Sequence, residues 1–167
     1  ADCDPDEYTT VLFDSATDTY PTSDDEINLV VQSTYDTKVM YEIVSFGEWK
    51  SFKKEVADWI IYLHMDDLNA FWDGERIVVG TGMVDDDVVA HEWSHAYTEY
   101  TSGLAYYYQS GAINEHMSDA FGEAVDQLNT AFNVSFDGTN DAMSASNETG
   151  MLPRHDSLVC NIAQNGI

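Results

Sequence analysis

Two histidines and a glutamate near the middle of the chain carry its strongest chemical signal. His91, Glu92 and His95 lie in the run VVAHEWSHAYTEY and spell H-E-x-x-H. On a helix, residues four apart share a face, so both imidazoles can point at one metal ion. Glu92 lies about 100° farther round the helix, where its carboxylate can reach a metal-bound water without ligating the metal. This spacing predicts a zinc hydrolase; the alternative is a surface helix with two satisfied histidines.

The residues around the motif predict the helix that it requires. The run Asp85-Asp86-Asp87 can cap free N–H groups and favours the positive end of the helix dipole. Gly103 is a stop signal, so we expect a helix over residues 85–101. One side of this helix is apolar and carries Val89, Trp93, Ala96 and Tyr100. The histidines lie on the opposite side with Val88 and Glu92, and therefore have a face of their own.

A second helix is expected over residues 110–128, directly after the first. Its predicted apolar side consists of Ile113, Met117, Ala120, Phe121, Ala124, Val125 and Leu128. Its other side is a strip of carboxylates, namely Glu115, Asp119, Glu123 and Asp126. Such a strip is usually a solvated face, but its place just after H-E-x-x-H favours a role at the metal. A catalytic zinc takes three protein ligands plus water, and Glu115 can supply the third if the two helices are antiparallel.

The rest of the chain predicts a mixed α+β fold in one domain spanning residues 1–167. Residues 1–84 are expected to be mainly strands and loops, with short strands and loops over 8–33 and one helix over 34–47. Residues 57–65 and 76–80 are predicted strands, the first of them open to a helical alternative. The zinc-binding helix pair occupies 85–128, and 129–167 is expected to be an irregular tail.

The charge of the chain limits its partners. With 31 acidic and 6 basic side chains in 167 residues, the net charge is -25. Such a surface will not attract nucleic acid or anionic membranes, although it can tolerate high salt or bind divalent cations. No run of about 18 apolar residues exists, so we expect no membrane span.

Other features suggest secretion. Cys3 and Cys160 are the two cysteines, and they are expected either to form one disulfide or to remain free thiols. Asn133 and Asn147 fit the N-glycosylation pattern, which matters only in a eukaryotic secretory pathway. The chain starts at Ala1 without a signal sequence, which fits a processed mature form or a cloned fragment.

The two helical motifs together resemble the thermolysin family of zinc metalloendopeptidases. DVVAHEWSHAYTEYTSGL is similar to that family's active-site helix, and SGAINEHMSDAFGEAV is similar to its second helix. The separation of His95 and Glu115 also matches, and Asn69-Ala70-Phe71-Trp72 resembles the family's N-A-F-W edge strand. The resemblance implies a zincin-like N-terminal lobe, in which a twisted sheet packs on the active-site helix and a second zinc-ligand helix.

The resemblance also implies roles for individual residues. His91, His95 and Glu115 would ligate zinc, with Glu92 as the general base and Asp119 accepting a hydrogen bond from His91. Tyr106 would stabilise the oxyanion, although Tyr107 and Tyr108 are neighbouring alternatives and all three can be packing residues. The remaining implied positions bind substrate or calcium: Asn69 and Ala70 for the substrate backbone, Val88 in an apolar pocket for the residue after the cut, Arg154 for a substrate carbonyl, and Asp87 and Asp126 for Ca²⁺.

The chain departs from the family pattern after the second helix. Relatives continue into a helical lobe that supplies a histidine and closes one side of the cleft, and that lobe is expected here to be absent or truncated. Three hypotheses follow: a secreted endopeptidase with a companion C-terminal chain or fragment, a complete but shortened enzyme, and a non-catalytic acidic domain that binds zinc or calcium. The intact Glu92 argues against the third, because a structural site has no use for it.

Overall fold

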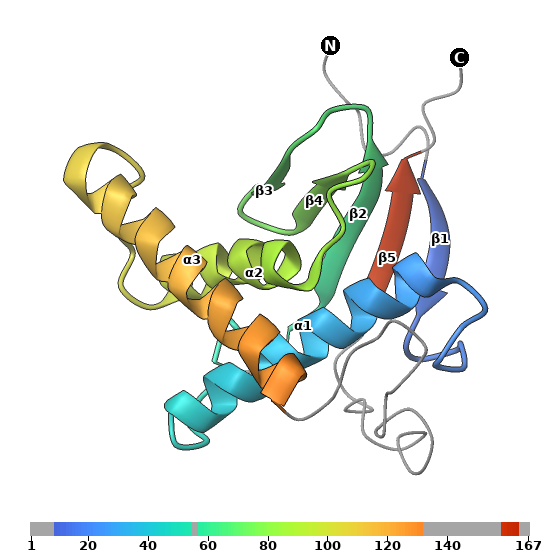
Figure 1. Ribbon diagram of the computed structural model, residues 1–167, viewed down its shortest axis with the longest axis horizontal. Coiled ribbons are helices and arrows are strands. Elements are labelled where there is room, and N and C mark those ends of the chain that lie inside the picture. Colours follow the sequence, from blue (N-terminus) through green and yellow to red (C-terminus); the bar gives the residue numbers. More distant parts are fainter. Residues whose placement is uncertain (1–8, 55–56, 132–157, 164–167) are drawn as a thin grey trace.

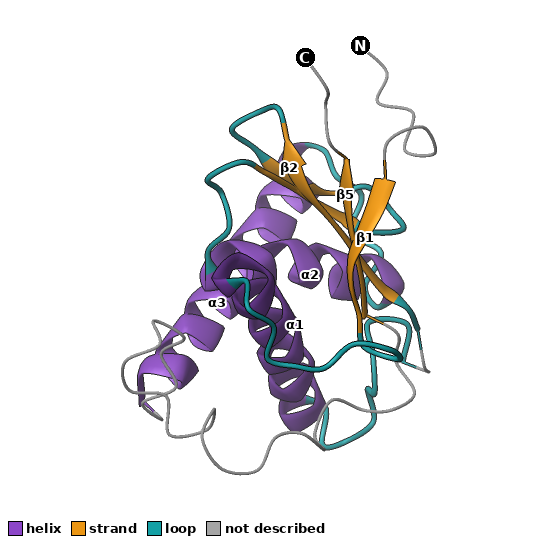
Figure 2. Ribbon diagram, turned by 90° about the vertical axis from the view of Figure 1, so that its right-hand side faces the viewer, coloured by secondary structure: helices purple, strands orange, loops and turns teal. Residues whose placement is uncertain are grey.

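A twisted sheet and three helices form two layers in the computed structural model, which describes residues 9–54, 57–131 and 158–163. The helices lie together on one face of the sheet (Figures 1 and 2). The elements in chain order are β1 (Thr9–Asp14), α1 (Asp25–Val44), β2 (Trp59–Met65), β3 (Ala70–Trp72), β4 (Ile77–Gly80), α2 (Asp86–Tyr100), α3 (Tyr108–Ala131) and β5 (Leu158–Ala163). This arrangement confirms the expected α+β class.

The strands are arranged in the order β1-β5-β2-β4-β3. β2 runs parallel to both β4 and β5, whereas β3 pairs antiparallel with β4 and lies at one edge. The predicted strands over 57–65 and 76–80 are confirmed as β2 and β4, and the N-A-F-W segment does form an edge strand. The irregular tail predicted for 129–167 is wrong at β5, because pairing with β1 and β2 supplies its backbone hydrogen bonds. That pairing joins segments far apart in sequence, so no local pattern reveals it.

The first helix begins earlier than the sequence patterns predict. Residues 25–33 were expected to be strands and loops, but they form the first half of α1. The Asp24 carboxylate accepts hydrogen bonds from the backbone N–H groups of Glu26 and Ile27, at 3.0 and 3.2 Å. This N-cap satisfies donors that the helix itself cannot satisfy. Val30 and Val31 are β-branched and by propensity favour a strand, yet both side chains are buried on the helix, so tertiary packing outweighs their propensity.

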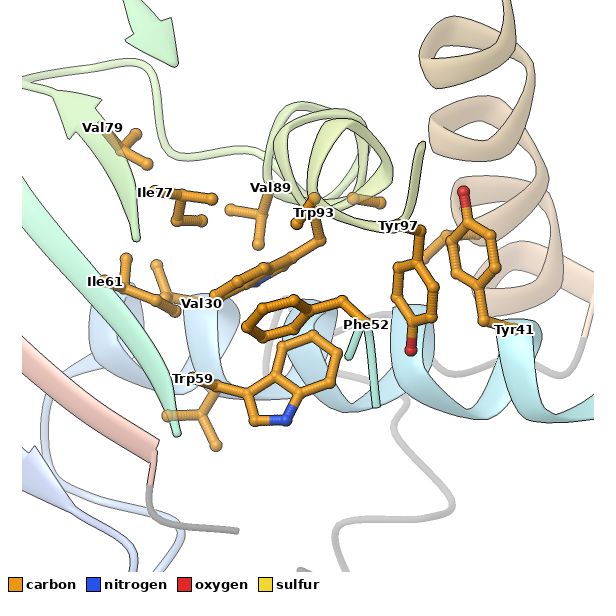
Figure 3. Close-up of a cluster of buried hydrophobic side chains, with 14 of the residues drawn as sticks. Val30, Tyr41, Phe52, Trp59, Ile61, Ile77, Val79, Val89, Trp93 and Tyr97 are labelled. Atoms are coloured by element: carbon orange, nitrogen blue, oxygen red, sulfur yellow. The ribbon is translucent and has the colours of Figure 1, made fainter. Parts of the chain in front are cut away.

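An aromatic cluster between the sheet and the helices forms the centre of the core (Figure 3). Trp93 of α2 packs against Trp59 of β2 and Phe52, with ring centroids 4.6 and 5.4 Å apart. Tyr97 of α2 stacks on Tyr41 of α1 at 3.6 Å. Val89, Trp93 and Ala96 are buried as expected, but the predicted core residue Tyr100 is 40% exposed and Tyr97 takes its place. The reason is that α1 covers the side of α2 on which Tyr97 lies.

The helix α3 contacts the rest of the molecule mainly through small and polar residues. Among residues 108–128, its buried positions are Gly111, Asn114, Ser118, Gly122 and Val125. Most of the apolar side predicted for it is exposed, including Ile113 at 52% and Met117 at 39%. Within that side only Val125 is fully buried, while Phe121 is partly buried against the core. Small side chains allow two helix backbones to approach closely, and hydrophobic periodicity does not register this kind of contact.

Several expectations fall on residues that the structure does not describe. Cys3, Asn133, Asn147 and Arg154 lie outside the described residues, and only the backbone of Cys160 is described. The disulfide and glycosylation predictions therefore remain predictions. Among the described helices, none has the length and apolarity needed to cross a bilayer.

Candidate metal centre

The helix α2 places His91 and His95 side by side, as the H-E-x-x-H spacing predicts. Their Nε2 atoms lie 3.0 Å apart. Trp93, two residues from each of them, is on the opposite side of the helix and is buried in the core. Asp85 caps the helix by accepting a hydrogen bond from the Asp86 N–H at 3.0 Å. The predicted start of this helix is thereby confirmed. Because the opposite face of α2 is buried in the core, both imidazoles have a rigid base.

The third ligand position is filled by a carboxylate of α3. Glu115 approaches His91 Nε2 at 3.3 Å and His95 Nε2 at 3.7 Å through its two carboxylate oxygens. One donor atom from each of these three residues fits within 4.8 Å of the other two. The structure therefore brings together the trio that the sequence suggested.

A glycine allows α3 to come this close. A Cβ atom added at Gly122 would lie 2.7 Å from the backbone oxygen of Asp87 and 3.6 Å from the Cβ of His91. A side chain at this position would therefore push α3 away from the start of α2. Since Glu115 and Asp119 lie on the same helix as Gly122, the close contact positions both carboxylates beside His91.

Polar groups of α3 hold the outer nitrogens of both imidazoles. His91 Nδ1 lies 2.9 Å from the Asp119 carboxylate, as the sequence led us to expect. His95 Nδ1 lies 2.8 Å from the Asn114 side-chain oxygen and 3.2 Å from Ser118 Oγ. The sequence reasoning assigned no role to Asn114 or Ser118, although both belong to the second helical motif. Because a carboxylate or amide oxygen can only accept, each Nδ1 carries the proton and each Nε2 presents a lone pair.

This donor set suits zinc. Two imidazole nitrogens and a carboxylate oxygen are a common set of three protein ligands for a catalytic zinc, which leaves a fourth position open. Two lone pairs facing each other at 3.0 Å repel unless a cation lies between them. Burial also lowers the pKa of His95 below its usual value, which favours the neutral imidazole that a metal requires.

Glu92 is buried beside the three ligand residues. Its side chain is only 6% exposed, and desolvation raises its pKa to about 7, with a smaller contribution from the negative charge of Glu115. The backbone N–H of Trp72 donates a hydrogen bond to this carboxylate and opposes the shift. The other oxygen, Oε2, has no hydrogen-bond partner among the described residues. Such a carboxylate is poised to exchange a proton near neutral pH.

A cleft of about 1060 Å³ runs past this centre. It is bounded by α2, α3 and the edge strand β3, and its lining includes Asn69, Ala70 and Val88. Tyr106 also lines it, with its ring centroid 5.8 Å from that of His95. Neither Tyr107 nor Tyr108 reaches the cleft, so the geometry favours Tyr106 among the three neighbouring tyrosines.

The start of β3 is positioned by a close backbone contact. Gly80 donates its N–H to the Asn69 carbonyl at 2.8 Å, and a Cβ there would lie 1.8 Å from the Asp67 carbonyl oxygen. Only glycine permits this approach. Asn69 and Ala70 are thereby held at the rim of the cleft, as a role in binding the substrate backbone requires.

The candidate calcium residues are not part of the ligand trio. Asp126 is close enough to Asp86 and Asp87 for their charges to raise its pKa, with desolvation as the larger cause. Asp85, Asp86 and Asp87 form a second group of carboxylates at the start of α2. The calcium role of Asp87 and Asp126 stays a prediction. The other described histidines are not part of the centre: His64 pairs with Glu26 at 2.5 Å, and His116 is exposed.

The fold and the site together define a metallopeptidase architecture, and comparison with known families gives the same result. The model of the thermolysin metallopeptidase catalytic domain matches residues 2–99, and that of the thermolysin metallopeptidase alpha-helical domain matches residues 102–145. The chain therefore belongs to the thermolysin family. Because α3 falls within the second match, the family's helical domain is represented here at least in part. The expected truncation of that domain stays a prediction.

Individual relatives agree with this assignment. The chain is 51% identical over 61 residues to a zinc metalloproteinase of Renibacterium salmoninarum, a match that covers 36% of this chain and 11% of that protein. It is 39% identical over 94 residues to an extracellular metalloprotease of Pectobacterium carotovorum subsp. carotovorum, covering 47% and 27%. It therefore spans only a small part of these relatives. Among solved structures, the precursor of protealysin, a metalloproteinase from Serratia proteamaculans, matches with a TM-score of 0.60 and 28% identity over 66% of this chain and 37% of that one.

Proposed function

We propose that the chain carries the zinc centre of a secreted endopeptidase, with His91, His95 and Glu115 as the metal ligands. The observation that carries the proposal is the buried Glu92 carboxylate, which lines the cleft next to the ligand trio and keeps one oxygen unpaired. A purely structural metal site gains nothing from such a group, because burying an unpaired carboxylate costs stability. The non-catalytic alternative is therefore disfavoured.

The bound zinc would polarise a peptide carbonyl and lower the pKa of a water molecule to about 7. Glu92 would accept a proton from that water. Burial raises its pKa to about 7, close to the pKa of the water, so the proton transfer is nearly balanced in energy. The same carboxylic acid can then donate the proton to the leaving amine. Asp119 and Asn114 would keep the two imidazoles in the orientation that presents Nε2.

The cleft supplies groups for the substrate. A peptide would lie along β3, whose outer edge is free of other described strands, with Asn69 and Ala70 pairing with its backbone. Tyr106 would stabilise the oxyanion from its place beside His95. Val88 would help to form an apolar pocket, so we expect cleavage before bulky apolar residues. Arg154, Ca²⁺ at Asp87 and Asp126, a companion C-terminal segment and the secreted location remain part of the proposal on family resemblance alone.

Replacement of Glu92 tests this function. In a Glu92→Gln variant, kcat for an apolar test peptide should fall by about 10²–10⁴, because the amide cannot take the water proton. Zinc content, measured on the same samples, should stay at one ion per chain. Glu48→Gln removes one negative charge from an exposed position outside the cleft and serves as the control. Equal rates for the wild type and Glu92→Gln would refute the catalytic assignment.

A further inference from the structure

The cleft beside the metal centre is lined by negative charge. Seven carboxylates line it, and no lysine or arginine among the described residues does so; the acids are Asp73, Asp87, Glu92, Glu99, Glu115, Asp119 and Glu123. Three of these belong to the proposed metal and proton machinery. Asp73 is compensated, because Arg76 Nε lies 2.8 Å from its carboxylate. Asp87 is a candidate calcium residue, which leaves Glu99 and Glu123 to contact a substrate.

Glu99 is placed to do so most directly. It follows His95 by four residues, so it continues the His91–His95 face of α2 one helical turn farther on. It is exposed, it lines the cleft, and none of the described ion pairs includes it. Among the described residues, no lysine, arginine or histidine therefore forms an ion pair with this carboxylate in the cleft.

Trp72 fixes the position of that charge. The indole Nε1–H donates a hydrogen bond to Glu99 Oε2 at 2.6 Å, which leaves Oε1 available to a ligand. The indole itself is held by ring contacts with Phe52 and Trp93, with centroids 5.4 and 5.8 Å away. Trp72 also lines the cleft at the end of β3, the strand along which the substrate would lie.

An oriented carboxylate beside an aromatic ring is a suitable site for an organic cation. The carboxylate attracts an ammonium or guanidinium group, and the aromatic ring adds a cation–π contribution and packs against the aliphatic part of the side chain. We propose that Glu99 and Trp72 form a specificity subsite for a lysine or arginine side chain of the peptide substrate. The inference rests on the proposed function, because it assigns the substrate class of the same cleft.

Spacing limits where that side chain lies. Glu99 is about 6 Å along α2 from His95, and a peptide strand advances about 3.3 Å per residue. The recognised cation therefore belongs to a residue within about two positions of the bond to be cut. This preference for a basic side chain is separate from the preference for an apolar residue directly after the bond.

Binding of intact peptides to the zinc-loaded Glu92→Gln chain provides the test. The blocked peptides all carry leucine directly after the bond to be cut and glycine at the other positions near it. Lysine, norleucine or glutamate then replaces glycine at one position at a time: the first or the second position before the bond, or the second position after it. At one position, the lysine peptide should bind about fivefold more tightly than the norleucine peptide in 0.1 M salt. The ratio should approach one in 1 M salt, because the charges are then screened.

Two further variants in the same background assign the effect to Glu99. Glu99→Gln keeps an oxygen that can accept the Trp72 hydrogen bond but removes the charge, so the lysine-to-norleucine ratio should fall to about one. Glu48→Gln changes the net charge equally and should leave the ratio intact. Equal binding at every position, a preference that survives Glu99→Gln, or no binding of any peptide would overturn the subsite. If the lysine preference is found but the chain with intact Glu92 cleaves none of the peptides, the proposed catalytic function fails and the subsite stands.

Discussion

The two helices that build the metal centre are held in place by different means. α2 buries Val89, Trp93 and Tyr97 in the aromatic core and presents the histidines from its other side. α3 leaves most of its apolar residues exposed and reaches the centre through glycine, asparagine and serine. One helix is thus anchored by hydrophobic burial, and the other by close backbone contact and hydrogen bonds to the imidazoles. Stability should therefore depend mainly on α2, and the geometry of the third ligand on α3.

Truncation of the largest α2 core residue should give the largest effect on stability. Trp93→Ala removes a fully buried ring that packs on Phe52 and Trp59 and loses a hydrogen bond to Thr34 Oγ1. We expect the free energy of unfolding to fall by about 3–5 kcal/mol, measured by urea denaturation. Ile113→Ala on the exposed side of α3 is the matched truncation and should change it by no more than about 0.5 kcal/mol. Comparable losses in the two variants would contradict the division of roles between the helices.

The buried acid on α2 should make the stability of the metal-free chain depend on pH. The pKa of Glu92 is about 7 in the folded chain against 4.5 for the free side chain, so the folded state binds the proton more tightly. Tighter proton binding adds up to about 3 kcal/mol to the free energy of unfolding. This contribution is complete below about pH 4.5 and is lost as the pH rises to about 7.

Urea denaturation from pH 4.5 to 8, in the presence of a chelator, measures this dependence. The Glu92→Gln variant should lose less stability than the wild type over that range, because its side chain does not ionise. Glu48→Gln controls for the change in net charge. Parallel curves for the wild type and Glu92→Gln would show that burial of Glu92 has no energetic consequence.

A smaller effect is expected from widening the contact between α2 and α3. In Gly122→Ala the new Cβ meets the Asp87 carbonyl oxygen at 2.7 Å, so α3 must move and take Glu115 and Asp119 with it. Zinc affinity, measured by chelator competition, should fall by about tenfold or more, since weakened support of a ligand typically costs 10–100-fold. Gln127→Ala, at an exposed position of the same helix, should leave the affinity unchanged. An unaltered zinc affinity in Gly122→Ala would show that the close contact does not position Glu115.

Local patterns predicted the elements that carry the chemistry. The aspartates at residues 85–87, the H-E-x-x-H spacing and the second helical motif located both helices of the centre to within a few residues. The strands β2 and β4 and the N-A-F-W edge strand were also predicted correctly. These features depend on caps, turns and alternation within short windows, which a sequence displays directly.

The predictions for α1, β5 and the buried side of α3 were wrong because long-range contacts outweigh local conformational preference there. The first half of α1 contains the β-branched pair Val30-Val31, and it is helical because both side chains are buried in the core in that conformation. β5 gains its structure by pairing with β1 and with β2. Most of the predicted apolar side of α3 is exposed, because its contact surface consists mainly of small and polar residues together with Val125 and Phe121. The support of His95 by Asn114 and Ser118 was missed for the same reason.

The sequence by itself determined the chemical inventory of this protein: two histidines one helical turn apart, a glutamate between them, and carboxylates repeated along the following helix. Helical periodicity is a local property, so these residues share faces regardless of the rest of the chain. Only the tertiary structure decided that Glu115 faces the histidines, that Glu92 is buried with a pKa of about 7, and that Trp72 binds Glu99. Those outcomes depend on how closely α2, α3 and β3 approach one another, and that distance is set by packing across the whole fold.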